Sequence, residues 1–317
     1  MKITTLKRNG LAALVVGERL VEIAPALQRH GLLASPPPLT LLDLLADWER
    51  NLALLVSLQE RLEIDEPGET FVETLLDAPI RRPGKMLFAA ANYHKHVRQF
   101  ERVEGEAHTN VRRAGVIQTH PYLFLKLPES VIGPTDSIML PAEFERVDWE
   151  LELGVIIGRE GRHIQAEQAM EYVAGFVVIN DITARDYNVR EDWPTLRTDW
   201  FIAKSFDTFC PVGPFFVPKE FVANYRDLTA RLWLNGQLYQ EFSPADMVYS
   251  VEEQMEWASR VTTLRPGDVL ATGSGPGNGL ATGRWLRPGD VLEAEITGLG
   301  RQKTPVFAER PVEGKHL

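Results

Sequence analysis

Apolar residues recur along the chain at two spacings, and these spacings predict where helices and strands lie. Within 40–62 the leucines follow a helical spacing, and Thr40 with Asp43 is typical of a helix N-terminus. The stretch 250–261 has the same character and opens with a serine that can cap it. A shorter helix is predicted over 166–172.

Short apolar runs bounded by turn residues predict β-strands in much of the remaining chain. The pair Asn235-Gly236 between two such runs is typical of a tight hairpin. The heptapeptide L-R-P-G-D-V-L occurs twice, at 264–270 and 286–292, and each copy is interpreted as a Pro-Gly turn that starts a strand. Short strands are predicted within 1–25, and longer ones at 85–91, 137–140, 149–158, 176–181, 228–234, 237–242, 269–272 and 291–296.

A change in character between 63 and 84 predicts two domains. This stretch is charged and contains Pro-Gly pairs, and the chain beyond it is dominated by strands. We expect a small N-terminal α/β accessory domain over 1–78 and a catalytic domain over 79–317. The two copies of the Pro-Gly turn suit a rolled β core, so the predicted class is α+β, mainly β.

Charge and cysteine content exclude several classes of protein. The 317 residues include 34 Lys+Arg and 44 Asp+Glu, a net charge of −10, which disfavours nucleic acid and anionic membrane as partners. Cys210 is the single cysteine, so an intrachain disulfide and a cysteine-based metal site are excluded. No apolar run is long enough for a transmembrane helix, and we expect a cytoplasmic protein.

The strongest local signal for chemistry is a pair of glutamates at the start of an apolar stretch. Glu150 and Glu152 are two residues apart, so a strand would place both side chains on one face. Neighbouring carboxylates in an apolar setting repel each other and need a cation, a proton or a divalent metal. Asp181 ends another apolar run and could add a third oxygen ligand, the type that Mg²⁺ and Mn²⁺ prefer. Exposed glutamates and a turn aspartate are the alternatives.

Histidine, lysine and glycine supply further candidates. His94 and His96 could share a face if the chain is extended there, or they could be an exposed pair at a helix start. Lys204 lies in an apolar and aromatic stretch, so its ammonium either reaches solvent past its own apolar stem or is held as a fixed cation. The glycine-rich loop 272–279 could bind an anion through its backbone N–H groups, or could be a flexible hairpin loop.

Seven short motifs, in their order along the chain, resemble the fumarylacetoacetate hydrolase family over about residues 79–306. Each motif is short, and the resemblance depends on their shared register. They are N-Y-x-x-H at 92–96, L-P-E-S-V-I-G-P at 127–134, D-W-E-L-E-L-G-V-I-I-G at 148–158, N-D-I-T-A-R-D at 180–186, K-S-F-D-T-F-C-P-V-G-P at 204–214, N-G at 235–236 and L-R-P-G-D-V-L-A-T-G-S at 264–274.

The resemblance implies a rolled mixed β-sheet fold of the family's C-terminal domain type, a homodimer, and Mg²⁺ or Mn²⁺ as cofactor. It implies cleavage of a C–C bond in a 2,4-diketo acid such as an acylpyruvate, with an anionic small molecule as substrate. The residues that it implicates are Glu150, Glu152 and Asp181 as metal ligands, His96 as the base, Lys204 as the cation beside a developing enolate, and Arg185, Asn188, Gly273 and Ser274 at the substrate.

Three departures from the family pattern put hydrolysis in question. Hydrolytic members often carry Glu three residues after the histidine, where this chain has Gln99, and a neutral amide cannot raise the basicity of His96. Asn188 stands in place of a frequent Gln, and Ser274 in place of Thr. An isomerase, tautomerase or decarboxylase of a 2-oxo diacid tolerates Gln99 better, because it needs no activated water. A catalytically silent binding module is a third hypothesis.

The polar and basic stretch 98–119 has two interpretations. Its arginines could belong to a mobile lid that helps to hold an anionic substrate, or the stretch could be an ordinary surface loop.

Overall fold

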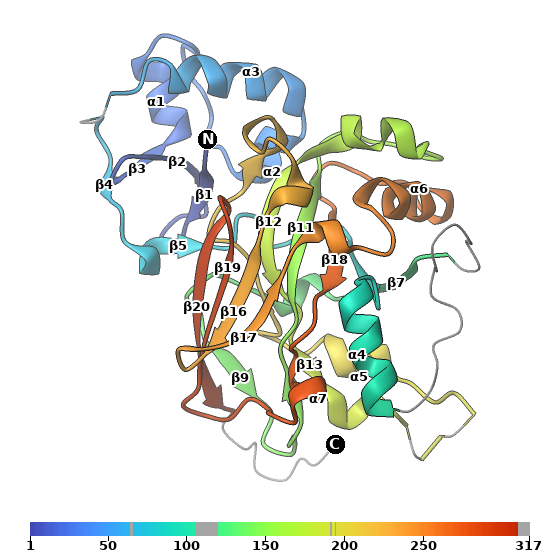
Figure 1. Ribbon diagram of the computed structural model, residues 1–317. Helices are drawn as coiled ribbons and strands as arrows, with labels where there is room; N and C mark the ends of the chain where they lie inside the picture. Colours follow the sequence, from blue (N-terminus) through green and yellow to red (C-terminus); the bar gives the residue numbers. More distant parts are fainter. Residues whose placement is uncertain (64–65, 105–119, 191, 194, 310–317) are drawn as a thin grey trace.

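The computed structural model describes residues 1–63, 66–104, 120–190, 192–193 and 195–309 (Figure 1). Over these ranges, none of the helices has the length and apolarity needed to span a bilayer. Strands dominate and form three larger sheets and two small ladders, which confirms the predicted class of α+β with mainly β structure. The stretch 105–119, most of the hypothesised lid, lies outside the described residues.

The N-terminal sheet has the strand order β4-β3-β2-β1-β5 and is built from residues 3–77. Its strands are β1 (Ile3–Leu6), β2 (Ala12–Val16), β3 (Arg19–Glu22), β4 (Glu69–Thr70) and β5 (Leu76–Asp77), and its helices are α1 (Ile23–Arg29), α2 (Leu41–Leu45) and α3 (Trp48–Gln59).

The helix predicted over 40–62 is wrong in one respect, because the structure has two helices there. Thr40 caps α2 as expected, and Asp43 completes the capping box. The backbone of Asp47 then leaves the helical region, with φ −138° and ψ 66°, and α3 begins at the next residue. After this break, Trp48 packs edge-on against Phe216 with their ring centroids 5.3 Å apart, a contact with a distant segment that helical spacing does not reveal.

The central sheet is mixed and has the order β15-β12-β11-β18-β6-β7. The neighbouring strands β11 and β12 are buried along their whole length, as their nearly continuous apolar sequences indicate. Strands β18 and β6 are parallel, and the other pairs are antiparallel. The strands are β15 (Val217–Pro218), β12 (Val173–Asn180), β11 (Leu151–Ile157), β18 (Val269–Ser274), β6 (Met86–Ala90) and β7 (Tyr122–Leu125).

The third sheet has the order β17-β16-β19-β20-β9 and lies beside the central sheet (Figure 1). The hairpin predicted at Asn235-Gly236 is confirmed, since both residues have the positive φ angles of a tight hairpin turn, 51° and 80°. The strands are β16 (Ala230–Leu234), β17 (Gln237–Phe242), β19 (Val291–Ile296), β20 (Gly300–Ala308) and β9 (Ile138–Leu140).

The two copies of L-R-P-G-D-V-L are turns that start strands, as predicted. In each copy the aspartate, Asp268 or Asp290, accepts a hydrogen bond of 2.7 Å from the backbone N–H of the arginine three residues earlier. The glycine of each copy has a positive φ, 85° at Gly267 and 93° at Gly289, which favours glycine there. The strands that follow are β18 and β19.

The remaining elements are helices and two small ladders. The predicted helix over 166–172 is a 3₁₀ helix, and the predicted cap of Ser250 on α6 is present. The small ladders pair β10 (Val147–Asp148) with β13 (Thr183–Ala184) and β14 (Cys210–Pro211) with β8 (Val131–Ile132), and the helices are α4 (His94–Glu104), α5 (Trp200–Lys204), α6 (Val251–Val261) and α7 (Gly279–Thr282).

A shared apolar core connects the N-terminal sheet to the central one. One cluster of buried residues includes Ile3 and Leu45 from the first 78 residues together with Phe88, Ile156 and Val177 of the central sheet. The backbone of Ile3 also exchanges hydrogen bonds with that of Phe216. The N-terminal sheet and the central sheet therefore pack against each other through one apolar core. The division into two domains at residue 78 stays a prediction.

Candidate metal centre

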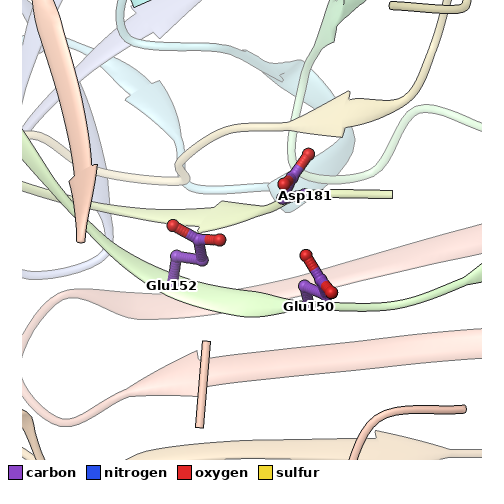
Figure 2. Close-up of side chains that lie close together, drawn as sticks. All are labelled: Glu150, Glu152 and Asp181. Atoms are coloured by element: carbon purple, nitrogen blue, oxygen red, sulfur yellow. The ribbon is translucent and has the colours of Figure 1, made fainter. Parts of the chain in front are cut away.

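Three buried carboxylates converge where β11 and β12 meet. One oxygen each of Glu150, Glu152 and Asp181 lies within 4.8 Å of the other two, and Figure 2 shows the three groups gathered in one small space. The antiparallel register pairs Leu151 with Asn180, and the backbone N–H of Asp181 donates to the carbonyl of Glu150 over 2.8 Å. Strand pairing therefore brings together side chains that are about 30 residues apart in the sequence.

Two buried lysines offset part of this negative charge. Lys204 Nζ lies 2.7 Å from Glu150 Oε2 and also contacts Asp181. Lys126 Nζ lies 2.5 Å from the other oxygen of Asp181 and 2.9 Å from the carbonyl of Ile182. Both lysine side chains are at most 2% exposed, so each ammonium has exchanged water for carboxylates. Lys204 is thus a fixed cation, one of the two alternatives that its sequence context leaves open.

Lys126 is not among the residues predicted from the sequence, although its sequence context does indicate a buried lysine. It follows the apolar strand β7 in the same way that Lys204 ends the apolar helix α5. Its ammonium lies 5.8 Å from the ring centroid of Phe88, and that of Lys204 lies 5.1 Å from the centroid of Phe124. A lone lysine directly after an apolar run carries the same information in both places.

Arg185 places a third cation beside the carboxylates. Its guanidinium contacts Glu150 Oε1, and its Nε and Nη2 lie 2.9 and 2.8 Å from Asp148 Oδ2. Arg185 is 9% exposed and Asp148 is fully buried. Burial alone would lower the pKa of Arg185, but Glu150 and Asp148 raise it above its ordinary value, so the group carries a permanent positive charge.

His96 is buried on α4 among the charged groups of the site. Burial lowers its pKa to about 4, and the charges that act on it come from Glu150, Arg185 and Lys204. The imidazole is therefore neutral at pH 7 and able to accept a proton. The segment is helical, and residues two apart on a helix do not share a face, so the hypothesis that His94 and His96 bind one metal together is wrong.

The glycine-rich loop after β18 does bind anionic groups, but they belong to the protein itself. The N–H of Gly273 donates to Glu152 Oε2 over 2.7 Å, and that of Gly279 donates to Asp148. Gly273 has φ +90°, and a Cβ there would lie 2.9 Å from the carbonyl oxygen of Ala89, so only glycine fits. These donors are engaged by side chains, which leaves them no role as a phosphate-type cradle.

Ser274 and Asn188 are the other predicted substrate residues, and both carry buried polar atoms. Ser274 is buried, and its Oγ accepts a hydrogen bond of 2.9 Å from Gln240 Nε2. Asn188 Oδ1 is buried and has no hydrogen-bond partner among the described residues, so it is available to a ligand. Gln99 Oε1 accepts from the N–H of Gly277 over 2.9 Å, which ties α4 to the glycine-rich loop.

The donor set suits a hard divalent cation. The three carboxylates are buried, and their oxygens lie close to one another. Oxygen ligands of this kind are the ones that Mg²⁺ and Mn²⁺ take. Glu152 is 1% exposed, and burial together with Asp181 and Glu150 raises its pKa well above the ordinary value. For Glu150, burial would also raise the pKa, but Lys204 and Arg185 outweigh it and hold the pKa below its usual range.

The contrast between the two glutamates predicts that metal uptake releases a proton. A ligating carboxylate must be ionised, and Glu152 holds its proton to higher pH than an ordinary glutamate. Metal affinity should therefore fall as the pH is lowered, and uptake should release up to about one proton per ion. Calorimetric titration with Mn²⁺ in two buffers of different ionisation enthalpy measures this number. A proton count of zero from pH 5 to 8 would contradict the shift assigned to Glu152.

Comparisons with known proteins agree on one family. The family model described as "Fumarylacetoacetate (FAA) hydrolase C-terminal" matches residues 85–307. The mitochondrial oxaloacetate tautomerase Fahd2a of Rattus norvegicus is 39% identical over 225 residues, which are 70% of this chain and 66% of that protein. The chain thus covers slightly less than two thirds of that relative's length.

Two solved structures extend the likeness to isomerases and hydrolases. The 5-carboxymethyl-2-hydroxymuconate delta-isomerase from Mycobacterium smegmatis matches with a TM-score of 0.61 and 30% identity, over 76% of this chain and 84% of that one. Fumarylacetoacetate hydrolase from Exiguobacterium antarcticum matches with a TM-score of 0.73 and 28% identity, over 98% and 100% of the two chains. The predicted rolled β fold is thereby confirmed.

Proposed function

The chain belongs to the fumarylacetoacetate hydrolase family, and on that premise we propose that it is a divalent-metal-dependent tautomerase of a 2-oxo dicarboxylate, with oxaloacetate as the substrate to test. The observation that carries the proposal is Gln99. At the position where hydrolytic members often carry a carboxylate, this chain has an amide that accepts a hydrogen bond from Gly277. No carboxylate at position 99 assists His96 in activating water, and a proton transfer between carbon and oxygen needs no such water.

In this proposal a bound Mg²⁺ or Mn²⁺ supplies electrophilic polarisation of the 2-oxo group. Glu150, Glu152 and Asp181 hold the ion. His96, neutral at pH 7, accepts the proton released from the carbon beside the oxo group and delivers it to the oxo oxygen, and the reverse reaction runs the same two transfers backwards. One C–H bond breaks and one O–H bond forms, so atoms balance without a further reactant.

The fixed cations have a separate role in the proposal. Lys204 lies beside two of the metal ligands, where its positive charge favours the enolate that develops on the substrate oxygen. In the proposal Arg185 binds a substrate carboxylate, and Asn188, Gly273 and Ser274 stay predicted substrate residues. A small anionic substrate and a homodimeric state are expectations that go with this proposal, as does a cytoplasmic location.

Hydrolysis of a C–C bond is the second candidate. It is supported by the likeness to fumarylacetoacetate hydrolase along the whole chain, 28% identical over 98% of it. Both reactions use the same carboxylates and the same enolate-stabilising cations. They differ in whether a water must be activated, which again makes Gln99 the position that separates them.

One assay distinguishes the two candidates. Oxaloacetate and acetylpyruvate are each incubated with the protein and Mn²⁺, with EDTA, and with Mn²⁺ and the Glu152→Gln variant, which corrects for catalysis by the free ion. Enol–keto interconversion is followed by ultraviolet absorbance, and products are resolved by NMR. Faster interconversion of oxaloacetate without release of acetate supports the tautomerase.

Other outcomes of this assay contradict the tautomerase. Release of acetate and pyruvate from acetylpyruvate, with oxaloacetate unaffected, would establish the hydrolase instead. Loss of carbon dioxide from oxaloacetate would indicate a decarboxylase. Binding of both compounds without turnover would favour a silent binding module.

Position 99 also gives a prediction about reaction choice. Gln99→Glu should raise the rate of acetylpyruvate cleavage, because a carboxylate one helical turn from His96 raises its basicity while still accepting from the Gly277 N–H. Gln99→Ala removes the tie to the loop without adding charge, and serves as the matched control. Equal cleavage rates in the two variants would show that position 99 acts only through packing.

A further inference from the structure

We propose that Asp148 is a positioning residue that holds the guanidinium of Arg185 in place for the substrate. The inference rests on the proposed function, in which Arg185 binds a carboxylate of the substrate. Asp148 does not belong to the group of three carboxylates that could hold the metal. Its contacts lead instead to Arg185, to Gly279 at the end of the glycine-rich loop, and to Leu280 in α7.

The local backbone fixes the two residues relative to each other. Strands β10 and β13 pair so that Asp148 lies opposite Thr183, and the N–H of Arg185 donates to the carbonyl of Arg146 over 2.8 Å. From this ladder the Arg185 side chain reaches Asp148 Oδ2 with Nε at 2.9 Å and Nη2 at 2.8 Å. Two donors on one oxygen restrict the rotation of the guanidinium plane.

The remaining contacts of Asp148 come from backbone N–H groups. Oδ1 accepts from Trp149 over 2.8 Å and from Gly279, and Oδ2 accepts from Leu280 over 3.1 Å. Asp148 is fully buried, and among the described residues its contacts are donors only. A carboxylate, which only accepts, fits this environment, whereas an asparagine would turn two N–H groups toward donors.

Gly279 allows the loop to come this close. A Cβ on this residue would lie 2.7 Å from Asp148 Oδ1 and 2.3 Å from the carbonyl oxygen of Arg284, so a side chain would separate the loop from the carboxylate. In Figure 1, α7 lies at the same end of the molecule as β13. The N–H groups of Gly279 and Leu280 therefore hold the same carboxylate that binds Arg185.

The position of Arg185 matters because its Nη2 lies between two acids. The same nitrogen contacts Glu150 Oε1 and Asp148 Oδ2. Without Asp148, the guanidinium would be free to pair fully with Glu150, where it would compete with the metal and turn away from the substrate. Asp148 thereby keeps the cation shared and oriented.

The test is a double-mutant cycle of Asp148→Asn and Arg185→Gln, measured with oxaloacetate and with oxalate as an unreactive probe. Asp148→Asn alone should raise KM and weaken oxalate binding to the Mn²⁺-loaded protein by about 10–100-fold, with a smaller change in kcat. In the Arg185→Gln background the same substitution should add less than about twofold. Equal losses in both backgrounds would overturn the proposal, because Asp148 would then act through the fold.

A control and a direct readout separate this proposal from the proposed function. Asp268→Asn changes another buried aspartate, which pairs with Lys85 and accepts from the backbone N–H of Arg265 over 2.7 Å, and should leave KM unchanged. The Nε–H signal of Arg185 in NMR, identified by its loss in Arg185→Gln, should exchange slowly with water in the parent protein and quickly in Asp148→Asn. Slow exchange in both would overturn the proposal even if oxaloacetate is not the substrate.

Discussion

Glu152→Gln should abolish binding of Mg²⁺ and Mn²⁺ and at the same time make the metal-free protein harder to unfold. Glu152 is buried beside two other acids, and within the described part of the chain its backbone donor is the N–H of Gly273 at 2.7 Å. The lysines contact Glu150 and Asp181 instead. Glu152 is thus the carboxylate that the site needs for a metal and that the metal-free fold supports least.

The stability effect has a definite dependence on pH. Because folding raises the pKa of Glu152, its ionised form destabilises the native state above that pKa, and the effect vanishes below the unfolded pKa of about 4.3. Removing the charge should therefore add about 1–3 kcal/mol to the free energy of unfolding at pH 8 and nothing near pH 4. Urea unfolding in EDTA at the two pH values measures the difference, and calorimetry with Mn²⁺ should show affinity reduced more than about 100-fold.

Glu150→Ala is the matched comparison, since it should lose the metal and also destabilise the fold. Removing Glu150 leaves Lys204 and Arg185 without one of their buried acidic partners. Breaking such a pair costs about 3–5 kcal/mol. If Glu150→Ala and Glu152→Gln changed the free energy of unfolding in the same direction, the lysines would not be neutralising Glu150 and Asp181 in preference to Glu152.

His96→Ala should keep the metal and lose turnover by about 100- to 10,000-fold, the range expected for removal of a general base. The buried imidazole has a pKa of about 4, so the acid limb of the parent pH–rate profile at saturating Mn²⁺ should lie near pH 4, well below 6.5. His94→Ala on the same helix is the control, because His94 is only half-buried. Full activity in His96→Ala would exclude this residue as the base.

Period and burial make the carboxylates of the candidate metal centre predictable. Glu150 and Glu152 share a face because a strand repeats every two residues, and the apolar residues that follow them in the sequence indicate that this strand is buried. Asp181 can be placed at the end of an apolar run, but its partner depends on the register of β11 against β12, which a single sequence does not show. The family resemblance supplies that step.

The residues that escaped prediction owe their roles to contacts between distant segments. Lys126 and Asp148 both stand inside or beside motifs that were recognised, yet their importance follows from Asp181, Arg185 and the glycine-rich loop, which lie tens of residues away. The break at Asp47 is of the same kind, because Trp48 packs against Phe216. Local spacing predicts which elements form, and tertiary contacts decide what the side chains do.

The cations beside the carboxylates bear on how the proposed ion would be loaded in a cell. Because Lys126, Lys204 and Arg185 already offset part of the acidic charge, we expect the chain to fold without metal, unlike small domains whose folding energy is that of metal binding. It would then leave the ribosome folded and load afterwards. The occupant would follow the free Mg²⁺ and Mn²⁺ of the surroundings, and the supply of these ions would set the occupancy of the site without any change in the abundance of the protein.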